Sequence, residues 1–331
     1  MNTASRSDSM RGGGRVTGGR TAIVSAAVCT DTDTASYFEL ATRAGRKCLE
    51  QAGVSPDQIG LVINAGVFRD NNIAEPAVAA LLQKRLEIGL EYQTGRVPAF
   101  SFDLLNGATG VVHALMAAQS FTSLGDLEYA LVLAGDTHPS LRRDVEDFPY
   151  SATGAALLVS ASAAAGGFGR LYTSAARDTV TADAWADLEA AGLEGRSAVT
   201  VRTGHGDPLA ASEAVVRACL AGEHLDSRDF AIGDAIVLAP APVPGFRERL
   251  AYRLGVPSTA IAGVDPAVGD PYTAAPVHAY VGAGELGLLE NARTVIFLAA
   301  DDSSAACLAY RPYPLSATSS TRDGQFKYSD V

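Results

Sequence analysis

Four continuous apolar runs constrain the fold of this chain more than any other feature. The runs IGLVINAG, YALVLAGD, DAIVLAP and TVIFLAAD lack the polar alternation of a half-exposed strand. A strand that is apolar on both faces needs helices on both sides of its sheet. Segments with helical spacing lie between the runs, among them ELATRAGRKCLEQAG and PAVAALLQKRLEIG. The pattern therefore predicts an α/β protein with internal sheets.

The order of these elements repeats. Each half is expected to hold a helix, a strand, a long helix, a strand and a returning strand. In the first half these lie at 38–52, at 59–64, after Gly107, at 129–134 and at 155–160. In the second half they lie at 208–221, at 235–239, after Asp270, at 294–299 and at 304–310. A period of about 150 residues is too long for a solenoid, so we expect a duplicated domain whose two sheets enclose the two long helices.

Composition excludes several classes of protein. The 331 residues are 47% hydrophobic and 19% charged, which suits a large core and excludes disorder. The net charge of −11 would repel phosphate backbones, so nucleic acid is not an expected partner. No run of 18 apolar residues occurs, and no membrane span is expected.

The sequence also indicates the domain limits and the cellular compartment. We expect a disordered lead at 1–19 without a secretory signal, the two halves of the repeat at 20–168 and 169–311, and a flexible tail at 312–331. The cysteines have no CxxC spacing and no nearby histidine, which indicates reduced thiols in a cytoplasm and no metal site. The run GAGELG has dinucleotide spacing, but it follows a helix and precedes a strand, so it predicts a helix end and no cofactor.

Several longer strings resemble one family. RAGRKCLEQAGVSPDQIGLVINAG, FSFDLLNGATGVVHAL, YALVLAGD and AYRLGVPSTAIAGVD resemble the thiolase superfamily, and most closely 3-oxoacyl-acyl-carrier-protein synthase III, or ketosynthase III. The strings occur in the family's order and spacing, over roughly Thr21 to Tyr310. The resemblance implies a five-layered αβαβα fold in two pseudo-repeated halves, and an obligate homodimer or heterodimer.

The resemblance also locates the family's Cys-His-Asn triad, and all three positions are substituted. FDLLNGATG places Ala108 at the nucleophile, DAIVLAPAPVPG places Pro240 at the histidine, and VGDPYTAA places Asp270 at the asparagine. The glycine-rich turn that helps to form the oxyanion hole becomes AADDSS, with Asp301 and Asp302 in place of glycines. If the fold is shared, the three aspartates lie close together, where they share a proton, bind a cation or are simply solvated.

These substitutions remove the usual chemistry. Covalent acyl transfer needs an activated nucleophile, and Ala108 offers none. Decarboxylation needs neutral donors for a developing enolate oxygen, but Pro240 has no donor and an ionised Asp270 would repel that charge. The amide at position 108 still lies at a helix N-terminus, which favours a thioester oxygen.

Glu75 is the candidate base. The segment FRDNNIAEPAVAALLQ is similar to the family loop that crosses the dimer interface into the partner's acyl tunnel, with Glu75 at its tip. In the related head-to-head condensing enzymes a glutamate at this place removes an α-proton, so the resemblance implies the same role here. The alternative is an ordinary first-turn glutamate beside Pro76.

Other polar residues have two interpretations each. Thr109 is a substitute hydroxyl or a helix cap, and His113, four residues on, reaches the pocket or fills the core. His138 is expected in a loop near the dimer interface. Tyr272 and His278, both expected on the second long helix, are six residues apart and cannot line one site.

Two functions follow. The first is a ketosynthase III-like enzyme of secondary-metabolite, polyketide-type biosynthesis that handles carrier-protein-bound acyl thioesters by non-covalent acyl transfer, condensation or cyclisation. A shortened N-terminal segment favours acyl carrier protein over coenzyme A as the thioester carrier. The alternative is a catalytically silent subunit in a heterodimer with an active ketosynthase III. An enzyme should direct Glu75 or Asp270 into an open tunnel, whereas a silent subunit can fill it.

Overall fold

The computed structural model describes residues 21–73, 75–89, 98–124, 127–146, 148–161, 166–175, 183–185, 200–202, 206–302 and 304–312. The lead expected at 1–19 and, apart from Pro312, the tail expected at 312–331 lie outside these residues. The described residues form two five-stranded sheets and a separate two-stranded sheet.

The first large sheet has the strand order β1-β5-β4-β2-β3. Its strands are β1 (Thr21–Cys29), β2 (Ile59–Asn64), β3 (Phe100–Asp103), β4 (Tyr129–Ala134) and β5 (Gly154–Ala161). The apolar runs at β2 and β4 form parallel neighbours that are buried along almost their whole length, as predicted.

The second large sheet has the order β10-β9-β11-β12-β6. Its strands are β6 (Gly167–Ala175), β9 (Ala235–Ala239), β10 (Ile261–Gly263), β11 (Thr294–Ala300) and β12 (Ser304–Arg311). β6 spans the domain boundary expected between 168 and 169, and that division stays a prediction. The separate pair consists of β7 (Asp183–Trp185) and β8 (Thr200–Arg202).

The two large sheets have the same topology. The series β1, β5, β4, β2, β3 corresponds in order to β6, β12, β11, β9, β10. Each pair of neighbours also has the same direction in both sheets: the first two pairs are antiparallel and the last two are parallel. The internal repeat inferred from the order of elements is therefore present in the strand order as well.

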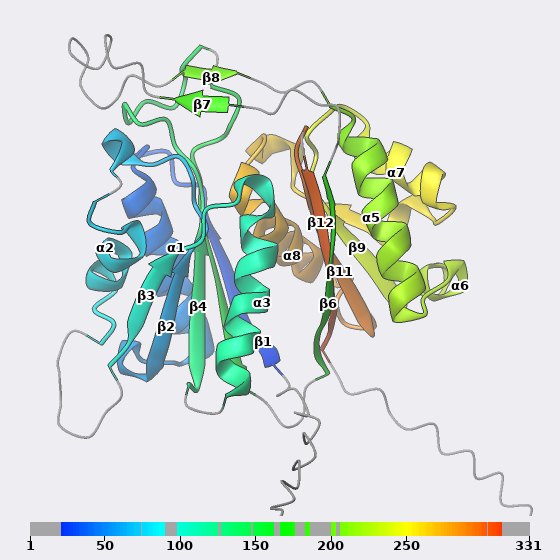
Figure 1. The fold of residues 1–331 in the computed structure, drawn as a ribbon, viewed down its shortest axis with the longest axis horizontal. Coiled ribbons are helices and arrows are strands. Elements are labelled where there is room, and N and C mark those ends of the chain that lie inside the picture. Colours follow the sequence, from blue (N-terminus) through cyan, green and yellow to red (C-terminus); the bar gives the residue numbers. More distant parts are fainter. Residues whose placement is uncertain are drawn as a thin grey trace, which may run out of the picture.

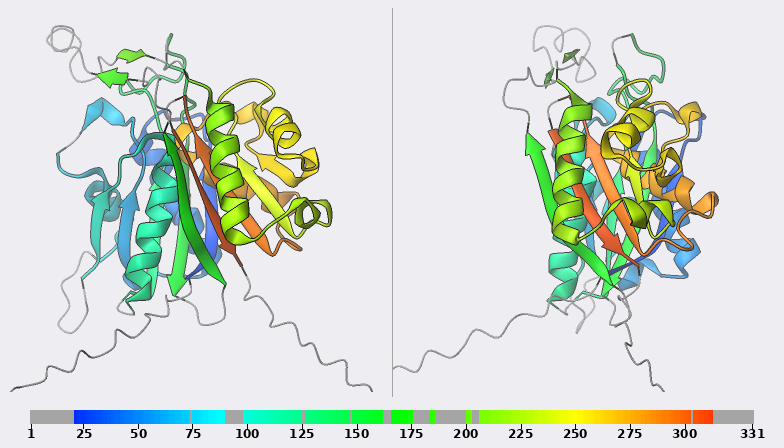
Figure 2. Two further views of the ribbon diagram at one scale, coloured as in Figure 1. Left: turned by 45° about the vertical axis from the view of Figure 1, so that its right-hand side comes forward. Right: turned by 90° about the vertical axis from the view of Figure 1, so that its right-hand side faces the viewer.

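Helices complete five αβαβα layers (Figure 1). On the outer face of the first sheet lie α1 (Tyr37–Ala52) and α2 (Val78–Arg85). Outside the second sheet lie α5 (Pro208–Glu223), α6 (Ser227–Ala231) and α7 (Phe246–Leu254). Between the sheets lie α3 (Gly110–Ser123) and α8 (Ala275–Glu285), as Figure 2 shows from two further sides. Single 3-10 turns occur at Pro56–Gln58, Asp70–Asn72, Gly107–Thr109, Ser258–Ala260, Pro266–Val268 and Tyr272–Ala274.

The composition of the central helices explains their place. In α3, the side chains that are 0% exposed include Val111, Val112, Ala114, Leu115 and Ala118. At 3.6 residues per turn these positions are distributed around the helix, which is the pattern of a helix covered on more than one side. Both long central helices predicted from the sequence are therefore confirmed, and the run GAGELG forms the end of α8 and the turn after it.

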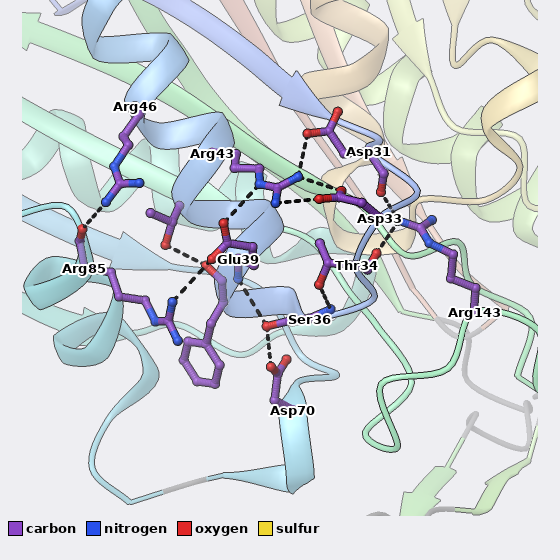
Figure 3. Close-up of polar contacts among 12 residues, drawn as sticks. Asp31, Asp33, Thr34, Ser36, Glu39, Arg43, Arg46, Asp70, Arg85 and Arg143 are labelled. Carbon is purple, nitrogen blue, oxygen red and sulfur yellow. Dashed lines mark hydrogen bonds and ion pairs between the residues drawn. The ribbon is translucent and has the colours of Figure 1, made fainter.

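On the surface of the protein, a polar network stabilises the loop that connects β1 to α1 (Figure 3). The Arg43 guanidinium contacts Asp31 and Asp33 at 2.8 and 2.7 Å, and Glu39 at 3.0 Å. Hydrogen bonds from Arg43 lower the pKa of both aspartates. Arg143 donates to the carbonyl oxygens of this same loop. Seven residues connect β1 to α1. The ion pairs of Arg43 and the hydrogen bonds of Arg143 hold them in place.

Two further properties concern the whole described chain. No helix in the described ranges is long and apolar enough to cross a membrane. The four cysteines are buried and none of them is in a disulfide.

Candidate active site

The predicted nucleophile position lies at the start of α3. Ala108 is 3% exposed and lies in the 3-10 turn Gly107–Thr109 that precedes the helix. Gly107 has a φ of 54°, a left-handed conformation that glycine adopts without a steric penalty. The turn contacts the ends of β11 and β12 and the turn Tyr272–Ala274. The helix start is thus buried between the two halves, and its side chain at position 108 is a methyl group.

The neighbouring polar groups are engaged locally. The Thr109 hydroxyl donates to the Asn106 carbonyl oxygen at 2.9 Å and accepts from Asn106 Nδ2 at 3.0 Å. His113 Nδ1 lies 2.9 Å from the Thr109 carbonyl oxygen and 3.3 Å from Asn106 Nδ2. The structure brings Thr109 and His113 together around Asn106. This arrangement matches a local structural role for the threonine better than that of a substitute nucleophile.

Tyr272 faces the start of α3 from the other half of the molecule. A Cβ atom placed on Gly107 would lie 3.0 Å from the Tyr272 hydroxyl and 3.2 Å from Asp301 Oδ2. Tyr272 was expected on the second long helix, but it begins the 3-10 turn before α8 and has a φ of 44°. This places a phenol and a carboxylate against the turn that holds Ala108.

An aromatic cluster surrounds Tyr272. We define it as Phe68, Phe148, Tyr150 and Tyr272. The rings of Tyr150 and Tyr272 are stacked, with centroids 4.0 Å apart at 18°. Phe68 lies 5.5 Å from Tyr150 and 6.0 Å from Tyr272, and Phe148 meets Phe68 edge-on at 5.3 Å. The cluster unites three segments that are far apart in the sequence and places them next to the start of α3.

Asp270 shapes the turn that presents Tyr272. Its Oδ1 accepts a hydrogen bond from the Tyr272 amide at 2.9 Å, and its carbonyl oxygen accepts one from the Ser151 amide at 2.7 Å. Partial burial raises the pKa of Asp270, and the bond from the Tyr272 amide opposes that rise. Asp270 therefore supports the backbone of the turn that presents Tyr272.

Pro240, predicted at the family's histidine position, is buried directly after β9. It has no N–H to donate. The loop that follows lines a pocket of about 410 Å³, which Gly269 and Asp270 also line. Ala108, Pro240 and Asp270 thus lie beside the ends of secondary-structure elements, and their correspondence to the family's triad stays a prediction.

Asp301 and Asp302 lie in the turn between β11 and β12. Asp301 Oδ1 accepts from the Ser304 amide at 2.8 Å and contacts the Ser304 hydroxyl at 3.2 Å. Asp270 and Asp301 both raise the pKa of Tyr150, after its burial, which is the larger cause. Among the residues that the structure describes, no three histidine, cysteine or acidic side chains are arranged to hold a metal ion.

Glu75 precedes α2. It is exposed on the segment between the turn Asp70–Asn72 and α2. The start of α2 is held by Asp103, which accepts from the amides of Val78 and Ala79 at 2.9 and 2.7 Å. The role of Glu75 in a partner's tunnel stays a prediction.

Asp136 is a residue that the sequence interpretation missed. It is fully buried and accepts hydrogen bonds from the amides of Val67, Phe68 and Thr273, and from the Thr273 hydroxyl at 2.6 Å. Burial raises its pKa to about 7, although these bonds oppose the rise. The only sequence signal is an acidic residue directly after an apolar strand, in YALVLAGD.

Two other histidines, His138 and His278, are buried. His138 is 7% exposed, meets Phe148 edge-on at 5.2 Å, and accepts from the Ser140 amide at its Nδ1. Its expected place near a dimer interface stays a prediction. His278 is 6% exposed on α8, and its Nε2 has no hydrogen-bond partner in the described part of the chain. Burial lowers the pKa of His278 to about 4.

Comparison with known proteins gives consistent results. No family model matches the chain. The β-ketoacyl-[acyl-carrier-protein] synthase III of Rhizorhabdus wittichii is 35% identical over 118 residues, which are 36% of this chain and 33% of that protein. The chain thus matches about a third of the length of such relatives.

Solved structures match over nearly the whole chain. The synthase III of Pseudomonas aeruginosa has a TM-score of 0.72 and 17% identity, over 89% of this chain and 99% of that one. The priming β-ketosynthase of a polyketide biosynthetic pathway has a TM-score of 0.66 and 17% identity, over 92% of this chain and 100% of that one. The five-layered fold expected from the sequence is therefore confirmed.

Proposed function

Starting from a chain with the thiolase-like fold and a sequence similar to ketosynthase III, we propose that this protein handles acyl thioesters without a covalent acyl-enzyme. The observation that carries the proposal is Ala108 at the buried start of α3, where the family nucleophile would lie. Transfer, condensation or cyclisation would then act on a chain that stays attached to its carrier.

Catalysis would depend on polarisation and proton removal. A helix start attracts a carbonyl oxygen through its free amides, and a base can then remove an α-proton. Glu75, delivered by a partner chain, is our candidate base. Its exposure on the isolated chain is compatible with that role.

The proposed partners are an acyl carrier protein or its acyl thioester, and a second ketosynthase III-like chain. The relatives' names include the carrier protein, and the similarity to a priming β-ketosynthase supports a polyketide-type pathway. The outer strand β3 supports a dimer because it is an edge of the first sheet and its Phe100 is 39% exposed. We place the protein in the cytoplasm, with reduced thiols.

The test is intact-mass measurement after incubation with octanoyl-pantetheine. No adduct should form on the protein, and an adduct at Thr109 would contradict the proposal. The control variant Ala108→Cys tests whether the probe can reach position 108. It should not restore condensation, because Pro240 leaves the thiolate without a base. If the protein turns over thioesters, Glu75→Gln should lower the rate by about 10²-fold.

The second candidate is a catalytically silent subunit of a heterodimer with an active ketosynthase III. The aromatic cluster favours it, because Tyr272 and its neighbours lie against the turn that contains Ala108. Co-expression with a cysteine-containing homologue distinguishes the two: activity that appears only in the mixture supports the silent subunit.

A further inference from the structure

Tyr150 and Tyr272 form a pair that the family triad does not explain. Their stacked rings have centroids 4.0 Å apart, and both residues are partly buried. The Tyr272 hydroxyl lies beside the turn that precedes α3. A Cβ atom on Gly107 would be 3.0 Å from this hydroxyl and 3.2 Å from Asp301 Oδ2. The pair therefore presents a phenol next to the residue that replaces the nucleophile.

The backbone of Tyr272 supports a functional interpretation. Its φ of 44° lies in the left-handed region, which is uncommon for a bulky residue. The Asp270 carboxylate holds the amide of this residue, and the stack on Tyr150 and Phe68 holds its ring. Such residues persist only where the surroundings determine their conformation, and they concentrate at functional sites.

The chemistry of the pair suits hydrogen-bond donation. Burial raises the pKa of Tyr150, as do the charges of Asp270, Asp136 and Asp301. Burial also raises the pKa of Tyr272, together with Tyr150 and Asp301. Both phenols thus stay neutral and protonated at physiological pH. Each neutral phenol has one proton to donate, and stabilisation of a carbonyl oxygen requires donors of this kind.

We propose that the Tyr150–Tyr272 pair is a carbonyl-binding site, in which a phenolic hydroxyl donates a hydrogen bond to the thioester carbonyl oxygen of the acyl chain. It supplies the neutral donor that Pro240 and Asp270 no longer provide. This inference rests on the proposed function and names the residues that bind its substrate.

The experiment measures binding of octanoyl-pantetheine that is isotope-labelled at the thioester carbonyl, by calorimetry and by isotope-edited infrared spectroscopy. A donated hydrogen bond lowers the carbonyl stretching frequency. Tyr272→Phe keeps the ring and its stack but removes the hydroxyl, so it should raise Kd by about fivefold to tenfold and return the band toward its free position. Tyr150→Phe should have a smaller effect in the same direction.

Tyr252→Phe is the matched control, because this tyrosine is 88% exposed and lies on α7, outside the second sheet. It should change neither Kd nor the band. Thermal unfolding of each variant verifies that it is folded, and the phenyl rings preserve the stack. If binding and the shifted band persist in Tyr272→Phe and Tyr150→Phe, the carbonyl site is overturned while the proposed function remains.

Two other outcomes also decide the matter. If the wild-type protein binds no probe, both the site and the proposed function are overturned. If Tyr272→Ala binds the probe and the wild type does not, the aromatic cluster is a plug, which overturns the site and favours the silent subunit.

Discussion

The central helices of the two halves start in the same conformation but with different residues. α3 follows a 3-10 turn that begins with Gly107 at φ 54°, and α8 follows one that begins with Tyr272 at φ 44°. Glycine takes this conformation freely, whereas for another L-residue it costs roughly 1–2 kcal/mol. The C-terminal half therefore keeps a strained tyrosine where the N-terminal half has a relaxed glycine, and contacts to Tyr150, Phe68 and Asp270 offset the strain.

The halves also differ in their buried titratable groups. Asp136 follows β4 in the first half and accepts four hydrogen bonds, so its carboxyl group is fully used. His278 lies on α8 in the second half, and its Nε2 has no partner in the described chain. Asp136 is thus a satisfied buried polar group and His278 an unsatisfied one, with opposite consequences for stability.

The largest effect is expected from Asp136→Ala. The change leaves three buried amides and a hydroxyl without their acceptor, so the free energy of unfolding should fall by about 3–5 kcal/mol. Urea denaturation measures it. The exposed Asp144→Ala is the control and should have little effect. A loss below about 1 kcal/mol would show that the bonds to Asp136 do not connect the halves energetically.

The pH dependence of the free energy of unfolding is a second test of the role of Asp136. The pKa of Asp136 rises from 3.8 to about 7, so the native state holds this proton more tightly than the unfolded state. Its contribution to stability is complete below pH 3.8 and is lost as the pH rises through about 7. Asp136→Asn removes the titration, so unfolding curves of this variant should lack that loss. Parallel pH profiles for the two proteins would contradict the assignment.

Gly107→Ala tests the paired turns. A Cβ atom adds left-handed strain and meets the Tyr272 hydroxyl at 3.0 Å, so the free energy of unfolding should fall by about 1–2 kcal/mol. In a Tyr272→Ala background the hydroxyl contact is gone and the loss should be smaller. A double-mutant cycle measures the difference. Additive effects would mean that the two turns do not interact.

His278→Leu should stabilise the protein. It replaces a buried, unpartnered nitrogen with an apolar group, which is expected to add about 1 kcal/mol to the free energy of unfolding. The native pKa of about 4 is below the ordinary 6.5, so the wild type loses stability as the pH falls from 6.5 toward 4. The variant should lack this loss in acid denaturation. Destabilisation at every pH would indicate a partner for this histidine.

The smallest effect is expected from Arg43→Ala. Its partners Asp31 and Asp33 are exposed, and water and salt screen such pairs. The difference in unfolding midpoint from the wild type should be small and should shrink as salt is added. A large difference that is independent of salt would mean that this surface network stabilises the protein as much as the buried hydrogen bonds of Asp136 do.

The fold was largely predictable because it depends on local patterns. Continuous apolar runs predicted β2, β4, β9 and β11 almost to the residue, and the order of elements predicted the repeat. Five strands were not predicted: β3, β6, β7, β8 and β10. β3 has only four residues, and β6 includes glycines and an arginine, so neither has a strong apolar run.

The site was predictable only in part. Motifs predicted the triad positions Ala108, Pro240 and Asp270, which lie beside the ends of secondary-structure elements, and their equivalence to the triad stays a prediction. The aromatic cluster and the bonds of Asp136 join segments more than 60 residues apart, such as Phe68 with Asp136. Hydrophobic periodicity describes neighbours along the chain and contains no information on such pairs, so these residues emerged only from the three-dimensional arrangement.

The buried cysteines can report separately on the opening of each half. Cys29 and Cys48 are buried in the first half, and Cys219 and Cys307 are buried in the second. Buried thiols that stay neutral react slowly, and burial raises the pKa of Cys48 to about 11. Each pair should become alkylated only when its own half opens. Mass-resolved alkylation would therefore show whether the duplicated halves unfold as one cooperative unit or as two, without any introduced label.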